Sequence, residues 1–218
     1  MIRLYGLPLS TYCTKVRIVL RIKGVDFEDL APPGGHYTSA EYRDNFAPGT
    51  IPFLEHDSIR LFDSEAIVEY LEEVFPDPSL LGSDPASRAN QRALSGFHTT
   101  RVEPRVRALF PLVKQAAGDN ACDSINACAQ QFQYELDRLD QVIDPQPFLG
   151  GQAPCLADCA YPSTIHMGMD ILEFLGSPVE MSSQLTNWLV KLDQQPVIGE
   201  EVESNRAAIA KWIQSVSA

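Results

Sequence analysis

The sequence predicts an α/β domain followed by an all-helical domain, and three observations carry this prediction. Residues 1–80 alternate short strand patterns with helical patterns. Residues 86–218 show helical periodicity alone, which is typical of a helical bundle. Between them, residues 76–85 contain three prolines and a glycine, a composition typical of a linker. With 218 residues, 44% of them hydrophobic, the chain can bury a substantial core.

The first strand and helix meet at a junction that suits an anion. Ile2–Tyr5 has the pattern of a short strand, and Gly-Leu-Pro at 6–8 ends it. Apolar residues then recur at helical spacing from Tyr12 to Lys23, and Gly24 follows as a stop signal. The first turn of a helix has unpaired backbone N–H groups and the positive end of the helix dipole. We therefore expect Ser10 and Thr11 to lie where an anion or a thiolate binds.

The remainder of the first domain follows the same alternation. Val25–Leu30 alternates apolar and polar residues, as a half-buried strand does. A turn-rich segment follows, with one short helix expected near Ser39–Asn45. Ile51–His56 and Ile59–Phe62 indicate a hairpin. Asp63 and Ser64 then open a helix, which Pro76 ends. Whether the Ile51–Pro52 peptide bond is cis or trans is left open by the sequence.

Three apolar stripes predict helices in the second domain. They are Ile125, Cys128, Phe132, Leu136, Leu139 and Ile143; Leu185, Trp188, Leu189 and Leu192; and Ile209, Trp212, Ile213 and Val216. Proline interrupts helical hydrogen bonding, so we expect Pro104 and Pro111 to bend or divide the segment after Ala86. For the same reason we expect Pro162 to bend or divide a helix that begins after Leu156.

Charge and cysteine content exclude several classes of function. The formal net charge of −12 argues against a nucleic-acid surface or an anionic membrane partner, because both need a basic patch. We see no leader-like start and no apolar run near the roughly 18 residues that span a bilayer. Five cysteines, an odd number, indicate free thiols in a reducing compartment. We therefore expect a cytoplasmic protein.

Four motifs in order resemble one known family. Ser10-Thr11-Tyr12-Cys13 resembles the Cys-x-x-Cys of thioredoxin-like domains with serine in place of the first cysteine. Lys15-Val16-Arg17 follows it, Ile51-Pro52 opens the third strand, and Asp63-Ser64 lies eleven residues beyond that proline. Together they resemble the thioredoxin-like, glutathione-binding domain of serine-type cytosolic glutathione S-transferases. The resemblance covers residues 1–80, with residues 86–218 as the helical domain that forms the electrophile pocket.

The resemblance implies a role for each matched residue. Ser10 is the catalytic residue, donating its hydroxyl proton to the sulfur of glutathione and so favouring the thiolate. Ile51, before the cis-proline Pro52, offers backbone groups to the cysteinyl part of glutathione. Asp63 faces the ammonium of the γ-glutamyl end, and Ser64 holds its carboxylate. Glutathione is then the co-substrate, a small electrophile is the second substrate, and the protein is a homodimer that contains no metal.

Simpler interpretations of the same residues stay open. Ser10 and Thr11, or Asp63 and Ser64, can act only as helix caps. Thr11 can replace Ser10 as the donor. Cys13 can form a mixed disulfide with glutathione, in which case the protein is a thiol reductase, or it can be a small buried core residue.

Some positions depart from the family pattern. Thr50 replaces the basic or amide residue that the family has two residues before Pro52, which argues against a contact with the glycyl carboxylate of glutathione there. His36 lies roughly where some classes of the family place a histidine for that carboxylate, but we interpret it as a solvated loop histidine.

The family has a Ser/Thr-x-x-Asp cap at the central helix of its second domain, and the matching residues here begin with Cys155. A thiol is a weak hydrogen-bond acceptor, so we expect a weaker cap. Asp158 can still accept hydrogen bonds from the free N–H groups. Cys155, Cys159 and His166 lack a known zinc spacing, so we interpret the two cysteines as core thiols.

Two other functions stay open within this fold. The serine-type start also resembles zeta-class enzymes that isomerise maleylacetoacetate, although their Ser-Cys is Thr11-Tyr12 here. A non-catalytic protein-binding module is the other alternative. The electrophile cannot be named from the sequence; His98, Arg101 and Tyr161 are guesses for its side of the pocket.

Overall fold

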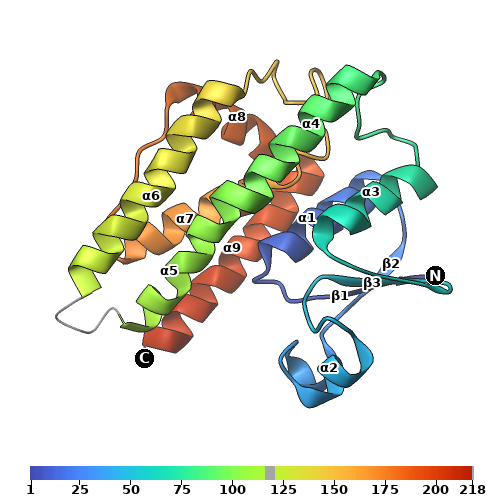
Figure 1. The fold of residues 1–218 in the computed structure, drawn as a ribbon, viewed down its shortest axis with the longest axis horizontal. Coiled ribbons are helices and arrows are strands. Elements are labelled where there is room, and N and C mark those ends of the chain that lie inside the picture. The colour runs from blue at the N-terminus through green and yellow to red at the C-terminus, as the bar shows by residue number, and fades with distance from the viewer. Residues whose placement is uncertain (116–120, 218) are drawn as a thin grey trace. The chain divides into compact units, whose positions relative to one another are not determined.

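The computed structural model describes the backbone of residues 1–115 and 121–217 (Figure 1). The chain divides into two compact units, Met1–Leu80 and Leu81–Ala218. The division falls within the proline-rich stretch 76–85. The first unit contains the sheet and the second is helical, so the predicted fold class is confirmed.

A four-stranded sheet in the order β2-β1-β3-β4 forms the centre of the first unit. The strands are β1 Ile2–Tyr5, β2 Phe27–Leu30, β3 Phe53–His56 and β4 Ile59–Phe62. β1 pairs parallel with β2, and the connection between them contains helix α1, Thr11–Ile22. β3 pairs antiparallel with β1 and with β4, and the register places Leu4 opposite Leu54. The predicted strand–helix–strand order and the hairpin are confirmed.

Helices cover both faces of this sheet. Figure 1 shows α1 and α3, Ser64–Val74, on one face of the sheet and α2, Ala40–Asn45, on the other. Ile2, Leu4 and Leu54 are buried, and the alternation of side chains along a strand places Ile2 and Leu4 on the same face. Tyr42 of α2 stacks on Phe46, which lies just beyond the end of α2. Phe46 packs in turn against Tyr5 and Phe53, with ring centroids 4.6 and 4.9 Å away. This aromatic cluster attaches the loop before β3 to the sheet.

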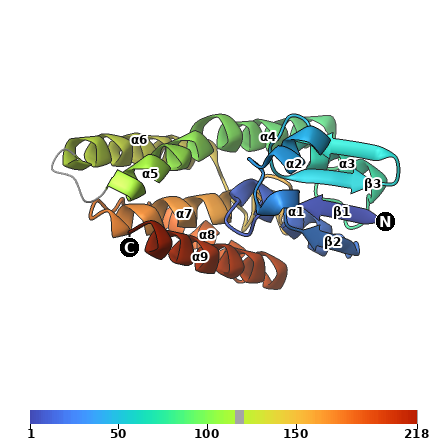
Figure 2. The same cartoon turned by 90° about the horizontal axis from the view of Figure 1, so that it is seen from below.

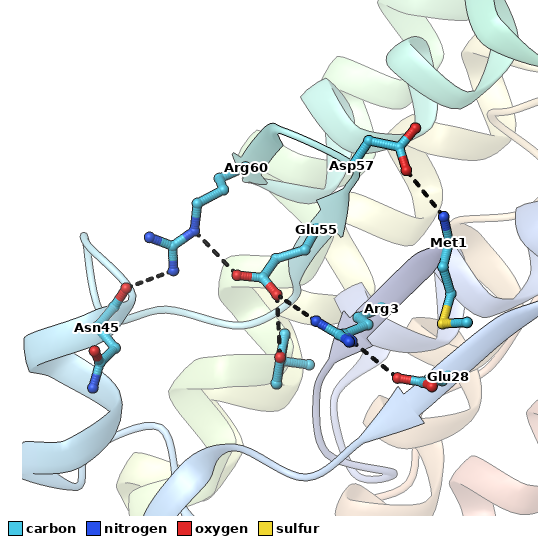
Figure 3. Close-up of polar contacts among 8 residues, drawn as sticks. Met1, Arg3, Glu28, Asn45, Glu55, Asp57 and Arg60 are labelled. Atoms are coloured by element: carbon cyan, nitrogen blue, oxygen red, sulfur yellow. Dashed lines mark hydrogen bonds and ion pairs between the residues drawn. The ribbon is translucent and has the colours of Figure 1, made fainter.

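A row of alternating charges crosses all four strands (Figure 3). In strand order it runs Glu28, Arg3, Glu55 and Arg60, each opposite the next in the register. Arg3 Nε lies 3.0 Å from Glu28 Oε2, and Arg60 Nε lies 3.2 Å from Glu55 Oε1. A one-residue slip of any strand would turn these side chains to the other face. The row therefore favours the observed register.

A buried cation joins the end of α1 to the end of α3. Lys23, the C-cap of α1, lies 2.7 Å from Glu72 and donates to the carbonyls of Phe75 and Pro78 at 2.7 and 3.0 Å. Glu72 also accepts from the backbone N–H of Leu80. The start of the linker is thereby held to the first unit.

The second unit is built from packed helices (Figure 2). They are α4 Pro85–Phe97, α5 Glu103–Gln115, α6 Ala121–Val142, α7 Tyr161–Phe174, α8 Ser183–Asp193 and α9 Pro196–Ser217. Figure 2 shows α5 and α6 side by side, with α7 and α9 forming a second layer. The predicted stripes face the core: Phe132, Leu189 and Ile209, one from each stripe, are all nearly inaccessible to solvent.

Of the three prolines, Pro162 acts differently from expectation. A π-helical turn, His98–Val102, separates α4 from α5, so the segment is divided just before Pro104, as predicted. Pro111 lies inside α5 without ending it. The helix expected after Leu156 begins only at Tyr161, so Pro162 occupies its first turn, where its missing N–H is not needed.

Asp158 organises the loop before α7. Its carboxylate accepts hydrogen bonds from the backbone N–H groups of Leu149, Gly150 and Cys155 and from the indole of Trp188, at 2.9 to 3.1 Å. Burial raises the pKa of this carboxyl group, and these donors act in the opposite direction. The expected partners of Asp158 are thus found, but Cys155 caps no helix because residues 156–160 form turns.

Replacing Lys23 with methionine should lower the free energy of unfolding by about 3–5 kcal/mol, because it leaves Glu72 as a buried carboxylate without its cation. Denaturant titration followed by circular dichroism measures the change. Arg3→Met is the control, since its partner Glu28 is exposed, and it should leave the free energy nearly unchanged. Equal stability of Lys23→Met and the unchanged protein would contradict this account.

Candidate functional site

Ser10 lies at the start of α1, as the sequence predicted. Its backbone is extended (φ −81°, ψ 115°), its carbonyl accepts from Thr14 N–H at 2.9 Å, and its side-chain oxygen accepts from Cys13 N–H at 3.3 Å. Ser10 is therefore the N-cap of α1. A hydroxyl that accepts a hydrogen bond keeps a proton that it can rotate toward another acceptor. At only 7% exposure, this proton is held at the positive end of a 12-residue helix.

Cys13 is packed inside the first unit. It is fully buried, and a Cβ placed on Gly6 would lie 2.7 Å from its sulfur, so the loop rests directly on the thiol. Burial raises the pKa of the Cys13 thiol, although Arg17 and a hydrogen bond with Ser10 lower it in part. A protonated, inaccessible thiol is a poor nucleophile. These features favour the core interpretation of Cys13 over the redox one.

Ile51 and Pro52 lead into β3. The peptide bond between them is cis, which answers the question that the sequence left open. Pro52 is buried, and the half-buried Ile51 packs against the cluster of Tyr42, Phe46 and Phe53. The first residue of β3 is Phe53, which pairs with Tyr5 of β1. Ile51 lies two residues before it, so its backbone is next to the N-terminal end of the strand.

Asp63 and Ser64 form the start of α3. Asp63 is the N-cap, and its carboxylate accepts from Glu65 N–H at 2.9 Å. Its φ of 72° is unusual for a residue other than glycine, and such strained backbone is concentrated at functional sites. Ser64, at 5% exposure, is the first residue of the helix. Capping accounts for Asp63 and does not by itself account for the choice of serine at 64.

An ion pair links the two helix starts. Lys15 of α1 is buried, and its ammonium contacts the carboxylate of Glu65, the residue after Ser64. A buried ammonium requires such a partner, so the pair restrains α1 and α3 relative to each other. The Ser10 and Ser64 junctions thus belong to one rigid part of the first unit.

Tyr5 is not available to this site. Its hydroxyl donates to Glu55 at 3.2 Å, and its pKa is raised by burial and by the charge of Glu55. His36 is exposed in a loop, where Nδ1 lies 2.8 Å from the hydroxyl of Thr38. The interpretation of His36 as a solvated loop histidine agrees with this position.

Two of the three guesses for the electrophile side are core residues. His98 is 1% exposed, with Nε2 2.8 Å from the Thr164 hydroxyl. Tyr161 is fully buried, and its hydroxyl donates to the Leu94 carbonyl at 2.7 Å. Both side chains are engaged inside the second unit, so they serve packing. Arg101 is exposed.

A cavity of about 1040 Å³ lies elsewhere, between α7 and α9 of the second unit. Its polar lining includes His166, which pairs with Asp193 at 2.9 Å, and Asp170, which pairs with Arg206. None of the predicted site residues lines it. Within residues 1–115 and 121–217, no group of three His, Cys, Asp or Glu residues is placed to hold a metal ion. No helix in this part of the chain is long and apolar enough to cross a membrane.

Comparison with known proteins identifies the family. Residues 4–79 match the family model described as "Glutathione S-transferase, N-terminal domain". The maleylacetoacetate isomerase of Pseudomonas aeruginosa is 32% identical over 163 residues, which cover 72% of this chain and 76% of that protein. The chain belongs to the glutathione S-transferase family. The relatives of this transferase-family protein are enzymes. Glutathione is the co-substrate of the family.

Solved structures of family members are similar to this protein over nearly its whole length. A theta-class glutathione S-transferase from Xanthomonas axonopodis pv. citri, with glutathione bound, is 25% identical with a TM-score of 0.75, covering 92% of this chain and 96% of that one. A maleyl pyruvate isomerase, described as a bacterial zeta-class transferase, has the same identity and TM-score and covers 93% and 97%. The likeness therefore includes the helical unit, which the family model does not match.

An aromatic disulfide reagent at neutral pH should modify the exposed Cys122 of the native protein and leave Cys13 unmodified, because the Cys13 thiol is buried and its pKa is raised. Peptide mass spectrometry measures both sites. Denaturation should make the two thiols react alike, which serves as the control. Native Cys13 reacting as fast as Cys122 would favour the reductase interpretation instead.

Proposed function

We propose that this protein ionises the thiol of glutathione at Ser10 and transfers it to an electrophilic small molecule. The observation that supports this best is the buried Ser10 hydroxyl at the start of α1. In this proposal Ser10 donates its proton to the sulfur as a hydrogen bond and forms no covalent bond itself. The thiolate attacks the electrophilic carbon, and either a leaving group departs or the addition product is protonated.

The energetics of this arrangement are sufficient. A thiol with a pKa near 8.5 is only a few per cent ionised at neutral pH. Lowering its pKa by about two units takes roughly 2.7 kcal/mol. A hydrogen bond to a charged group supplies about 1.5–3 kcal/mol, and a helix N-terminus about 0.3–1 kcal/mol. The thiol proton leaves to solvent water, so no general base is needed.

The remaining residues of the proposed site bind the rest of glutathione. Ser64 and the N–H groups at the start of α3 suit the γ-glutamyl carboxylate, and the carboxylate of Asp63 suits the neighbouring ammonium. The backbone of Ile51, at the end of β3, suits the cysteinyl part, which adds as a short strand. The resemblance to the family assigns these roles, and the Lys15–Glu65 pair between the two helix starts agrees with a ligand that touches both.

We extend the proposal to assembly and location. β4 lies at an edge of the sheet, and its Ile59 and Phe62 are 41% and 50% exposed. Apolar side chains on an open edge favour contact with another protein surface. We propose that this surface contributes to a homodimer, that the protein acts in the cytoplasm, and that residues 86–218 supply the electrophile pocket.

A glutathione-dependent isomerase is the second candidate, because several of the similar proteins are named as maleylacetoacetate or maleylpyruvate isomerases. Such a reaction also needs a glutathione thiolate, which adds to a conjugated carbonyl substrate, allows rotation about the former double bond and is then expelled. Ser10 would act in the same way. Thr11-Tyr12 in place of Ser-Cys is the feature of this chain that argues against it.

Ser10→Ala should raise the pKa of the bound glutathione thiol by about 1–2 units, because it removes the hydrogen bond to the thiolate. The turnover rate at neutral pH should fall about 3- to 25-fold, because a thiol with a pKa near 6.5 is already mostly ionised at pH 7. The loss should shrink as the pH rises above the new pKa, where the thiolate forms unaided. A pH series of kcat with a nitroaryl halide and glutathione measures this.

Thr11→Val is the matched control, because it removes the neighbouring buried hydroxyl. It should change the thiol pKa far less than Ser10→Ala. If the effects are reversed, Thr11 is the donor; if neither variant alters the pKa, the proposed chemistry is wrong.

A direct comparison of substrates should separate the candidate functions. We expect the purified protein to bind to immobilised glutathione and to conjugate a nitroaryl halide faster than it isomerises maleylacetoacetate. Spectrophotometric assays with equal enzyme concentrations measure both rates. Faster isomerisation would favour the second candidate, and neither retention nor turnover would favour a non-catalytic binding module.

A further inference from the structure

Arg17 is a buried cation next to the proposed site. It lies in α1 and is 5% exposed. Its guanidinium makes a two-bond contact with Asp29 of β2: Nε to Oδ2 is 2.7 Å, and Nη2 to Oδ1 is 3.0 Å. Such a fork-to-fork pair fixes the direction of the guanidinium as well as its charge.

The third contact of Arg17 reaches the loop that leads to Ser10. Nη1 donates to the carbonyl oxygen of Leu7 at 3.4 Å, and the same oxygen accepts from Ser10 N–H at 3.1 Å. One backbone carbonyl therefore connects the guanidinium to Ser10. The contacts run from Asp29 through Arg17 and Leu7 to the residue that carries the catalytic hydroxyl.

The loop has little freedom to move independently of α1. A Cβ on Gly6 would lie 2.7 Å from the Cys13 sulfur and 3.4 Å from Nη2 of Arg17, so the backbone lies directly on these two side chains. Gly6 N–H also donates to the carbonyl of Leu30, the residue after Asp29, at 2.9 Å. The loop is thus held between β2 and α1.

We propose that Arg17 and Asp29 are positioning residues: together they hold the Gly6–Leu9 loop against α1 and so set where the Ser10 hydroxyl meets the sulfur of glutathione. This inference rests on the proposed role of Ser10. A misplacement of about 1 Å in a reacting group can cost on the order of 100-fold in rate, so the stiffness of this support matters.

Asp29→Asn is the variant that tests the proposal, because Asp29 is 38% exposed and the change keeps its shape. It weakens the two-bond contact and leaves the charge of Arg17 unneutralised. A loosened loop should raise the pKa of the bound glutathione thiol by about one unit, with about threefold less thiolate at neutral pH. A purely through-space effect of Arg17 has the opposite sign, since an unneutralised cation favours the thiolate.

Arg17→Lys is the second variant. It keeps the positive charge, but an ammonium cannot contact both Asp29 oxygens and the Leu7 carbonyl in the same geometry. It should shift the thiol pKa in the same direction as Asp29→Asn. KM for glutathione should rise by no more than about threefold in both variants, the amount that the weaker binding of the thiolate itself accounts for, because Asp63 and Ser64 belong to α3 and are untouched.

Glu28→Gln is the matched control. Glu28 precedes Asp29 on β2, so its side chain points to the opposite face of the sheet, and it pairs with Arg3 in the exposed row of charges (Figure 3). It should leave the thiol pKa and kcat as they are. Ultraviolet absorbance of the thiolate in the protein–glutathione complex, titrated with pH, measures the pKa without any electrophile.

The possible outcomes are distinct. A raised pKa in Asp29→Asn and Arg17→Lys, with Glu28→Gln unchanged, supports the inference. An unchanged or lowered pKa in Asp29→Asn overturns it, as does an equal shift in Glu28→Gln. If Ser10→Ala raises the pKa and Asp29→Asn does not, only this inference fails; if Ser10→Ala itself has no effect, the proposed function fails and this inference with it.

Discussion

Three basic side chains of one helical segment are buried in the first unit, and each requires an acidic partner. They are Lys15, Arg17 and Lys23, the last at the C-cap of α1. Because an unpaired buried charge is strongly destabilising, the partners must lie within contact distance. These partners are Glu65, Asp29 and Glu72, from α3 and β2. The position of α1 relative to the sheet and to α3 is restrained at three points along its length.

This restraint bears directly on the proposed chemistry. A helix start attracts an anion only over a short distance, so the start of α1 and the start of α3 must both lie where glutathione needs them. The chain carries a net charge of −12, and long-range attraction of an anionic tripeptide is therefore absent. Local donors must do the binding. The buried pairs keep those donors in place.

Much of the fold followed from periodicity and turn residues. The strand at Ile2–Tyr5 and the hairpin strand at Ile59–Phe62 were predicted to the residue, since period-two patterns bounded by turn signals are specific. The predicted start of the helix after Leu156 was wrong, because α7 begins at Tyr161. Proline fits equally well in the first turn of a helix and at a bend inside one, so the sequence cannot show which position Pro162 takes. His98 and Tyr161 were guessed as site residues from their position alone, and their burial could not be read from helical spacing.

The order of elements, the two helix starts and the motif with serine at position 10 can be predicted from local sequence, because capping, periodicity and turn chemistry are local properties. The folded chain adds the cis geometry at Pro52, the burial of Cys13, and the hydrogen bonds that run from Asp29 through Arg17 to the loop before Ser10. Those features depend on residues distant in the chain that pack together. No local pattern records which carboxylate a buried cation will meet.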